Sequence, residues 1–452
     1  MGFSERNTSI IEKLTKKAIK STYINPDLYQ KYQVKRGLRD IDGKGVPAGL
    51  TEISDIISYK VNEKGEEVSC EGELYYRGIN IEDLIKGSMI SKVHAFEEAA
   101  YLLLFGDLPD RAQLAEFETL LTSYRELPKT FVRDIIMKAP SEDMMNAMAR
   151  SVLALYYYDN NADDISISNI LKQSLQLTAQ FPLIAVYGLK AYEYYYKDKS
   201  LFIHHPDASL GTAANIFRLL RMDSSYTELE ERMLDLLLVL HAEHGGGNNS
   251  TFAMHLLSSS ATDTYSCISG ALGSLKGPRH GGANIKVVKM FEDLKKNIRK
   301  GTESEVEEYL NKVLDKQAFD KQGLIYGMGH AVYSLSDPRA NIIREYVEKL
   351  ALEKGRFEEF DLYKKVEKLA PQIIGDRRKT YKGVSANVDF YSGFAYSMLD
   401  IPVELFTPLF AVSRIVGWSA HRIEEVSNSS KIIRPGYVSI APHRKYTPME
   451  NR

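Results

Sequence analysis

The spacing of apolar residues in this 452-residue chain has the period of a helix almost everywhere. Strand-like alternation occupies one stretch, SYKVNEKGEEVSCEGELYYRG at 58–78, where it continues on both sides of a glycine turn. Such a pattern is typical of a hairpin. The sequence therefore predicts a mainly α, multi-helix protein with a small β-hairpin element near its N-terminus.

The length and charge of the chain limit its organisation and its partners. A chain of 452 residues exceeds one ordinary hydrophobic core, which favours a large domain and a second, smaller one. Its 58 basic and 60 acidic residues leave a net charge of only −2, so no overall field attracts nucleic acid or an anionic membrane. We expect no nucleic-acid partner and no membrane partner.

The compartment is predicted from the start of the chain and from its cysteines. The first residues lack the apolar core of a secretory signal, and no apolar run approaches the roughly 20 residues that span a membrane. Cys70 and Cys267 lie far apart in sequence, which fits a reducing compartment and excludes a disulfide scaffold. The sequence therefore predicts a cytoplasmic protein.

The motif HAEHGGGNNS, which begins at His241, follows a helix with clear boundary signals. Thr227 and Glu230 are predicted to form a capping box, and MLDLLLVL is apolar nearly all round, as a buried helix is. Gly245 stands where a left-handed C-terminal cap is expected. The sequence therefore predicts that His241 and His244 close the last turn of a buried helix.

These two histidines are either metal ligands or buried groups with satisfied hydrogen bonds. A zinc deaminase also needs a PCxxC motif, and another class of zinc enzyme needs HExxH; the chain contains neither. No further ligands follow at a recognisable spacing. We therefore expect no metal at HAEH.

Three more titratable residues stand at predicted helix edges, beside small residues. They are His280 in GPRHGGAN, His330 in GLIYGMGHAVYSLSDPRA and Asp389 in ANVDFYSG. Each one alone would be an ordinary loop residue. Together with HAEH they form a coherent set of acid and base groups, which indicates an active site.

Three arginines form a candidate anion site. Asp337 and Pro338 suit the N-cap and first position of a helix, which places Arg339 among the free N–H groups of its first turn. Arg414 lies in a mostly apolar helix and needs either a buried ion-pair partner or a ligand. Arg434 precedes a proline and is expected in extended backbone, where alone it would be a surface residue. Together they predict binding of two carboxylates through bidentate pairs.

A dense basic cluster in GDRRKTYKG is either a solvated loop or a contact for phosphates; its members are Arg377, Arg378, Lys379 and Lys382. The glycine-rich loop 323–329, with Gly327 and Gly329, could offer backbone groups to a phosphate or a base. That loop is neither a GxGxxG after a strand nor a GxxxxGK[ST]. NAD and nucleoside triphosphates are therefore not favoured as ligands.

Taken in order, five motifs of the chain resemble the successive motifs of the citrate synthase family: HAEHGGGNNST, GPRHGGAN, GMGHAVYSLSDPRA, NVDFYSG and FAVSRIVGW–HRIEE. The likeness extends from RGLRDIDG and LYYRGINIEDLI to IIRPG. It implies a mainly α homodimer. In each chain a large domain (1–282 and 404–452) and a small domain (283–403) would close over the substrates.

The resemblance also implies roles for single residues. His280 matches the histidine that hydrogen-bonds the thioester oxygen of acetyl-CoA, and Asp389 matches the base that removes the methyl proton. His330 matches the histidine that polarises the keto oxygen of oxaloacetate, and His244 matches a residue that helps to hold oxaloacetate. In this family the HAEH motif binds no metal, and the reaction uses no metal or redox cofactor.

The remaining roles concern the negatively charged parts of the substrates. Arg339, Arg414 and Arg434 match the arginines that bind carboxylates, the last of them donated by the partner subunit. The glycine loop and the basic cluster would then contact CoA.

The activity implied is that of a citrate synthase, which condenses acetyl-CoA with oxaloacetate and water to give citrate and CoA. A 2-methylcitrate synthase, which uses propionyl-CoA, would have the same catalytic set, and a relative that cleaves citryl-CoA would share part of it. Two alternatives come from other classes: a non-catalytic scaffold that binds CoA or carboxylates, and a metal hydrolase centred on HAEH. Intact His280, His330 and Asp389 argue against the scaffold.

Overall fold

The computed structural model describes residues 5–40, 44–278, 280–330, 332–378, 383–428 and 431–452. The chain falls into two compact units, the first made of residues 1–50 and 434–452 and the second of residues 51–433. The first unit contains α1 (Glu5–Thr22), α2 (Asp27–Lys31) and two 3₁₀ turns, η1 (Arg36–Leu38) and η5 (Met449–Asn451).

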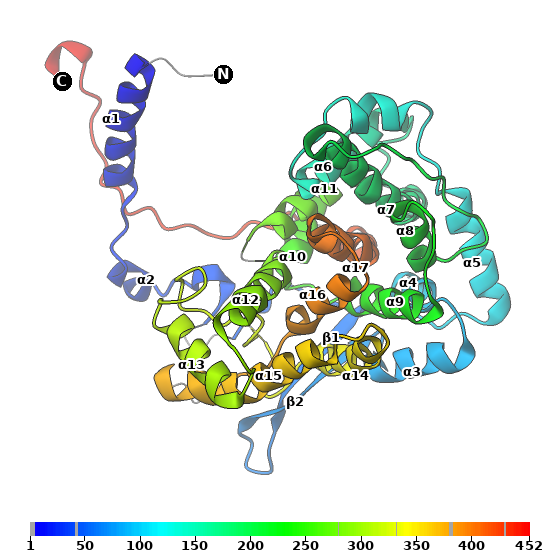
Figure 1. Ribbon diagram of the computed structural model, residues 1–452. Coiled ribbons are helices and arrows are strands. Elements are labelled where there is room, and N and C mark those ends of the chain that lie inside the picture. The colour runs from blue at the N-terminus through cyan, green and yellow to red at the C-terminus, as the bar shows by residue number, and fades with distance from the viewer. Residues whose placement is uncertain (1–4, 41–43, 279, 331, 379–382, 429–430) are drawn as a thin grey trace. The chain divides into compact units, whose positions relative to one another are not determined.

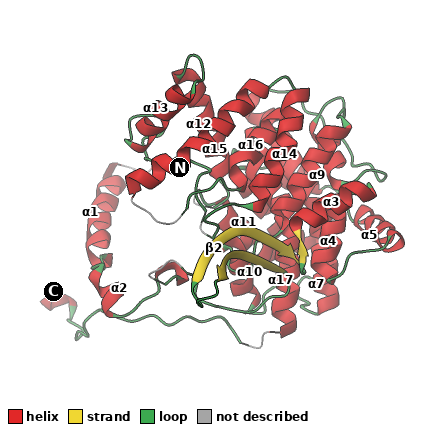
Figure 2. Cartoon of the chain, turned by 90° about the horizontal axis from the view of Figure 1, so that it is seen from below, coloured by secondary structure: helices red, strands yellow, loops and turns green. Residues whose placement is uncertain are grey.

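The second unit is built almost entirely of helices, with one small sheet (Figures 1 and 2). Its strands are β1 (Ser54–Val61), β2 (Glu67–Tyr76) and β3 (Ile79–Asn80). Its α-helices are α3 (Ile81–Ser91), α4 (Ala95–Phe105), α5 (Arg111–Ser123), α6 (Met144–Leu155), α7 (Ile167–Lys197), α8 (Thr212–Leu220), α9 (Glu228–Ala242), α10 (Asn249–Ser258), α11 (Thr264–Lys276), α12 (Ala283–Asn297), α13 (Glu303–Leu314), α14 (Pro338–Glu353), α15 (Phe357–Arg378), α16 (Val388–Met398) and α17 (Phe406–Asn428). Its short helical segments are η2 (Val132–Met137), η3 (Tyr156–Tyr158) and η4 (Val403–Leu405). The predicted mainly α fold with a small β element is confirmed. No helix among the described residues is both long and apolar enough to cross a membrane.

The β element is the predicted hairpin. β1 and β2 pair antiparallel from Ser54 opposite Tyr76 to Val61 opposite Glu67, and β3 adds a short third strand beside β2. Gly65 turns the chain between β1 and β2 with a φ of 78°, which suits a residue without a side chain. Figure 2 shows the strands as one curved ribbon in an otherwise helical chain.

Helix α17 lies at the centre of the second unit, with α7, α9 and α10 around it (Figure 1). Its residues from Phe406 to Arg422 are all buried, because it contacts helices on several sides and has no face toward solvent. The largest of these side chains include Trp418 and Arg414, both fully buried. Polar groups on this helix therefore need partners within the protein or from a ligand.

Close packing of α17 against the end of α9 depends on Gly417. A Cβ at this position would overlap the carbonyl oxygen of Ala242 and Oε2 of Glu243. We expect Gly417→Ala to lower the free energy of unfolding by about 1–3 kcal/mol, the usual range for overpacking a core. The matched control is Gly375→Ala in α15, where a Cβ meets nothing within 4 Å. That change is expected to stabilise the protein by up to about 1 kcal/mol through helix propensity. Equal urea unfolding midpoints for the two variants would contradict this account of the α9–α17 contact.

The end of α9 differs from the sequence prediction. The capping box of Thr227 and Glu230 is present, but the helix ends at Ala242, and Glu243 is extended. The cause is Tyr76 of β2, whose hydroxyl donates to Val239 O at 3.0 Å and accepts from Glu243 N–H at 3.1 Å. The hydroxyl thus lies between Val239 O and Glu243 N–H, which would otherwise form the next i→i+4 hydrogen bond of the helix.

The two histidines of HAEH consequently differ in their backbone. His241 lies in the last turn of α9, as predicted, whereas the prediction for His244 was wrong, because His244 follows the helix. Gly245 has the expected positive φ, 83°, but does not cap the helix directly.

Helices α12 to α16 carry the later part of the chain. Within this segment α16 packs on α12 and α14, and α13 packs on α15, while α14 and α16 also contact α9. Helix α12 begins at Ala283, and Asp337 and Pro338 are the N-cap and first residue of α14, as predicted. The division into domains at 283 and 403 stays a prediction.

Candidate active site

The glycine loop at 327–329 is bonded to the segment that precedes Asp389. Gly329 N–H donates to Ser385 O at 2.7 Å, and Asn387 N–H donates to Gly327 O at 2.9 Å. A Cβ at Gly327 would stand 2.8 Å from a ring carbon of Phe390, so the close approach requires glycine. These bonds bring the segment carrying His330 beside the start of α16. The same bonds occupy Gly329 N–H and Gly327 O, two of the backbone groups that the sequence analysis offered to a phosphate or a base.

The ring of His330 is oriented by its own loop. Its Nδ1 accepts the backbone N–H groups of Val332 at 3.0 Å and Tyr333 at 3.2 Å. In the neutral ring the proton is therefore on Nε2, which can donate. The ring lies 5.3 Å from that of His244 and 4.9 Å from that of Tyr333, centroid to centroid. The structure thus brings His330 and His244 together.

Arg339 and Asp337 form a buried ion pair at the start of α14. Asp337 accepts from the Arg339 backbone N–H and Nε, each at 3.0 Å, and from Nη2 at 2.8 Å. The same carboxylate accepts the N–H of Val388 at 3.2 Å, which ties α14 to the first turn of α16. Arg339 Nη2 lies 3.5 Å from Nε2 of His330. The sequence predicted Asp337 only as a cap and missed its pairing with Arg339.

The histidines at the end of α9 are kept neutral. Burial, together with the charge of Arg339, lowers the pKa of His241 to about 3 and holds that of His244 well below its usual value. His241 Nδ1 lies 2.8 Å from the carbonyl of Leu237. Nε2 of both rings is buried without a hydrogen-bond partner among the described residues. Buried polar atoms of this kind are normally paired, which indicates that a ligand completes the site.

Arg414 points its free end into the same region. Its Nε donates to the carbonyl of His241 at 2.6 Å. Its guanidinium carbon lies 4.7 Å from the centre of the Phe410 ring. Nη1 and Nη2 are buried and have no hydrogen-bond partner in the described part of the chain. Burial lowers the pKa of this arginine to about 10, although the charge of Glu243 opposes the shift. A ligand carboxylate would satisfy both nitrogens, so the structure favours the ligand over the ion-pair alternative.

His280 is held by two residues that the sequence analysis missed. Its Nε2 lies 3.1 Å from Oγ of Ser250, which also accepts from Nε1 of Trp418 at 3.2 Å and lies 3.0 Å from Asn248 Oδ1. Burial lowers the pKa of His280 to about 4, and the charge of Arg414 adds to the effect. The ring is therefore neutral at physiological pH. No local motif could have identified Ser250 or Trp418, because both contacts join segments distant in sequence.

The carboxyl group of Asp389 holds its proton more tightly than an ordinary aspartate does. Burial raises its pKa to about 7, although the charges of Arg339 and Arg414 oppose the shift. Part of the residue stays accessible, but Oδ1 is buried without a partner among the described residues. Asn387 caps α16 by accepting the N–H of Asp389 at 3.0 Å. A carboxylate whose pKa is near 7 can act as a general base at physiological pH.

A buried ion pair lies behind Arg414. His421 Nε2 is 3.0 Å from Oε1 of Glu243, and both side chains are fully buried. Although burial lowers the pKa of His421 and raises that of Glu243, their mutual attraction dominates, and the values become about 9 and about 2. Glu243 also accepts from Ser54 Oγ at 2.9 Å and from Gly245 N–H. No sequence pattern predicted this pair, which holds the turn after α9 in place.

The other predicted ligand-binding residues lie apart from these groups or outside the described residues. Arg377 is exposed and donates to Asp315 and to Asn311. Lys379, Lys382 and the side chain of Arg378 lie outside the described residues. Arg434 belongs to the first unit and is exposed. The predicted roles of these residues stay predictions.

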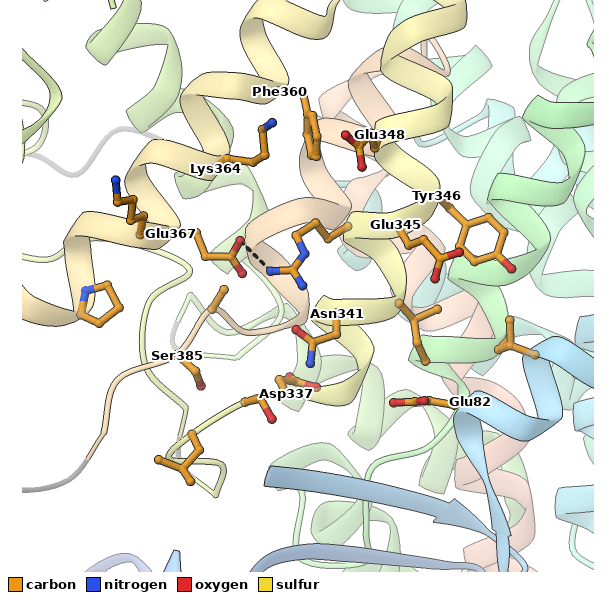
Figure 3. Close-up of a pocket in the computed structure, with 18 of the residues that line it drawn as sticks. Glu82, Asp337, Asn341, Glu345, Tyr346, Glu348, Phe360, Lys364, Glu367 and Ser385 are labelled. Atoms are coloured by element: carbon orange, nitrogen blue, oxygen red, sulfur yellow. Dashed lines mark hydrogen bonds and ion pairs between the residues drawn. The ribbon is translucent and has the colours of Figure 1, made fainter. Parts of the chain in front are cut away.

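A cavity of about 900 Å³ lies beside the candidate site, lined by residues of α3, α14 and α15 (Figure 3). Asp337 and Ser385 form part of its wall, and Arg344 and Glu367 pair at its edge at 3.2 Å. Among its described lining residues there is no histidine and no Asp389. The cavity is therefore a neighbour of the candidate site and does not contain the acid–base groups.

Comparison with known proteins gives matches over most of the chain. The family model for the C-terminal domain of citrate synthase matches residues 38–436. A citrate synthase of Synechocystis sp. is 35% identical over 90% of this chain and 92% of the relative. A 2-methylcitrate synthase of Shewanella oneidensis is 34% identical over 90% of this chain and 97% of the relative.

Solved structures give the same result. The crystal structure of citrate synthase from Pyrobaculum aerophilum aligns with a TM-score of 0.73 and 31% identity, over 92% of this chain and 95% of that one. A ternary complex of the citrate synthase from Thermoplasma acidophilum with carboxymethyl coenzyme A and oxaloacetate aligns with a TM-score of 0.76 and 25% identity, over 93% of this chain and 99% of that one.

Proposed function

The chain belongs to the citrate synthase family, a family of transferases, and on that premise we propose that it condenses acetyl-CoA with oxaloacetate and water to give citrate and CoA. The observation that carries the proposal is the buried carboxylate of Asp389. Its pKa is raised to about 7. It lies within the electrostatic reach of Arg339 and Arg414. A base of this kind suits removal of a proton from the methyl carbon of acetyl-CoA. The two neighbouring cations suit a dicarboxylate bound beside that carbon.

On the thioester, Asp389 takes a methyl proton while His280 stabilises the enolate oxygen. A thioester methyl is a weak carbon acid, so a base alone is too slow without a donor at the oxygen. Ser250 has one hydroxyl proton to donate. Nε2 of His280 and Oδ1 of Asn248 compete for this proton, and the mechanism requires that it goes to Nε2. The ring proton is then on Nδ1, where it can donate to the thioester oxygen. A neutral ring makes this donation without adding a charge to the site.

On oxaloacetate, His330 and Arg339 polarise the keto group. The loop bonds to Nδ1 of His330 place the proton of the neutral ring on Nε2, the nitrogen that would donate to the keto oxygen. Arg339, Arg414 and a partner subunit's Arg434 would bind the two carboxylates, and His244 would donate from its unpartnered Nε2. The enolate carbon then forms the new bond to the keto carbon, and the keto oxygen takes the proton from Nε2 of His330 to become a hydroxyl. Water hydrolyses the resulting citryl thioester to citrate and CoA. These steps require no metal or redox cofactor.

The arrangement suits closure of a small domain over a large one. His330, Arg339 and Asp389 belong to the predicted small domain at 283–403, and His244, His280 and Arg414 to the predicted large domain. Assembly of the site only after oxaloacetate binds would protect acetyl-CoA from hydrolysis. We also propose a cytoplasmic homodimer, with Arg434 donated to the neighbouring site.

A 2-methylcitrate synthase is the second candidate, because a relative with that activity is 34% identical. One extra methylene in the acyl group changes selectivity by only about 1–3 kcal/mol, and the catalytic groups are the same. We propose the acetyl substrate, and a direct comparison tests it.

The test measures free CoA with a thiol reagent, using oxaloacetate with either acetyl-CoA or propionyl-CoA. A higher kcat/KM with acetyl-CoA supports citrate synthesis, and a higher value with propionyl-CoA supports 2-methylcitrate synthesis. Reactions without oxaloacetate measure simple thioester hydrolysis and should be silent. If neither thioester is turned over, the scaffold alternative replaces both proposals.

The rate should depend on pH through Asp389. Because the carboxylate must be ionised to act as a base, kcat/KM is expected to fall by about tenfold per pH unit below pH 7. His280 does not contribute between pH 5 and 8, because its pKa is about 4. Samples held at low pH and assayed again at pH 8 would separate this effect from unfolding. A rate that stays constant down to pH 5 would contradict the assignment.

A further inference from the structure

Two histidines and a glutamate outside the proposed reaction converge where α10 meets α17. His255 comes from α10, and His421 and Glu424 stand one turn apart on α17. His255 Nε2 lies 3.1 Å from His421 Nδ1, which lies 3.7 Å from Glu424 Oε2, and all three atoms lie within 4.8 Å of one another. We propose that these three atoms bind a transition-metal ion, with Zn²⁺ the best match.

The spacing of the three atoms is close to what zinc needs. Tetrahedral Zn²⁺ holds nitrogen and oxygen ligands at about 2.0–2.2 Å, which places ligand atoms roughly 3.3 Å apart. Two of the three contacts, at 3.1 and 3.7 Å, fall on either side of this value, and the third is no longer than 4.8 Å. Side-chain rotation has to bring the three atoms closer together to complete the coordination.

The outer nitrogen of each ring is held by a carboxylate. His255 Nδ1 lies 2.7 Å from Glu425 Oε2, and His421 Nε2 lies 3.0 Å from Glu243 Oε1. Carboxylates in these positions retain a proton on the outer nitrogens and leave the inner ones with lone pairs, as in histidine ligands of zinc. Two lone pairs 3.1 Å apart repel each other unless a cation lies between them. That cation is either a proton or a metal ion.

Glu424 supplies an independent observation. Its Oε1 accepts the N–H of Glu52 at 2.8 Å, which fixes the carboxylate. Its Oε2 is buried and has no hydrogen-bond partner among the described residues. Its ion-pair partner is Nδ1 of His421, 3.7 Å away, and a metal ion between these two atoms would take the place of the proton on that ring.

Gly246 borders one side of the cluster with backbone alone. A Cβ there would stand 3.4 Å from His255 Nε2 and 3.7 Å from His421 Nδ1, so only backbone borders the inner nitrogens on that side. A water molecule could occupy a fourth coordination position from this direction. The site would then have three protein ligands and one exchangeable one.

The test is a calorimetric titration of the full chain, free of affinity tag and treated with chelator, with Zn²⁺ near neutral pH. We expect one ion per chain, and protons released to the buffer as the ion replaces the proton between the rings. Co²⁺ in its place should give the strong visible absorption of a four-coordinate complex.

The variants separate this site from adventitious binding. His255→Gln and Glu424→Gln should each abolish the single-site isotherm and the Co²⁺ spectrum. Glu425→Gln, which removes only an outer carboxylate, should weaken binding by about 10–100-fold. His94→Gln is the matched control, because His94 Nδ1 pairs with Glu118 at the same 2.7 Å but has no second histidine. It should bind as the wild type does.

His255 is changed rather than His421, because it is partly exposed and its loss disturbs the core less. Melting temperatures verify that the variants fold. The proposal is overturned if the wild type takes up no stoichiometric metal, or if a folded His255→Gln or Glu424→Gln protein binds it as the wild type does.

Discussion

Asp389→Asn is expected to lower kcat by at least about 10²–10⁴-fold, the usual contribution of a general base. The amide has nearly the shape of the carboxylate but cannot accept the methyl proton. The N-cap of α16 by Asn387 uses the backbone N–H of residue 389, so the helix should remain in place. The measurement is CoA release at saturating oxaloacetate and thioester.

The same substitution should stabilise the protein at neutral pH. The pKa of Asp389 is about 7 in the folded chain and close to 4 when unfolded, so between these values the unfolded state has fewer protons. Stability contributed by this residue therefore falls as pH rises from about 4 to about 7, and it stays low above that. An asparagine is neutral at every pH and avoids this loss. The melting temperature of Asp389→Asn should exceed that of the wild type at pH 8 and equal it near pH 4.

Asp361→Asn serves as the control for both measurements. Asp361 lies on α15, is partly exposed and pairs with neighbouring lysines of its own helix. The activity of this variant should match the wild type, and its melting temperature should not exceed that of the wild type at pH 8. An Asp389→Asn enzyme with wild-type turnover would show that another group is the base.

Arg414→Met should raise the KM for oxaloacetate by roughly 30- to 3,000-fold, with the KM for the thioester little changed. Loss of a buried, charged hydrogen-bonding partner costs about 2–5 kcal/mol, and about 1.4 kcal/mol corresponds to a factor of ten. In the free protein both terminal nitrogens of Arg414 lack partners among the described residues, and its Nε bond to the carbonyl of His241 is the hydrogen bond that is lost, so its removal should lower the melting temperature only slightly.

Arg422→Met is the matched control on the same helix. Arg422 is equally buried, but its guanidinium donates to Ser258 at 3.1 Å, Thr264 at 3.2 Å and Thr262 O at 2.7 Å. Its loss leaves those groups unpaired, so it should lower stability and leave the KM for oxaloacetate unchanged. If both variants behave alike, Arg414 has a structural role and does not bind the substrate.

The local features of this protein could be predicted from its sequence. The capping box at Thr227 and the start of α14 at Asp337 follow from short-range rules, as does the hairpin turn at Gly65. Three acid–base residues of the candidate site, His280, His330 and Asp389, were also predicted individually, because each is a titratable group beside small residues at a predicted helix edge. The structure shows His244 and His330 close together, which no spacing in the sequence could establish.

The features that escaped prediction all depend on contacts between distant segments. Ser250 meets His280 and Trp418 only because α10, α17 and the turn before α12 pack together. His421 and Glu243 are 178 residues apart, and nothing in the sequence indicates that these two side chains meet. The glycines of the loop 327–329 were correctly identified as special. Their observed hydrogen bonds, however, are to residues 385–387 of the protein.

The hydroxyl of Tyr76 has a consequence for motion as well as for shape. Where a water molecule interrupts a helix, it can exchange with solvent, and the helix can close again while it is absent. The phenol is part of β2 and fully buried, so it cannot leave the space between Val239 O and Glu243 N–H by exchange with solvent. The direct helical hydrogen bond between these two groups can therefore form only when the hairpin unfolds locally. The amide of Glu243 should therefore exchange its hydrogen as slowly as amides of the core. His244 and its neighbours would then keep one geometry from one turnover to the next. The movement that admits substrates would be made by the segments that carry His330, Arg339 and Asp389.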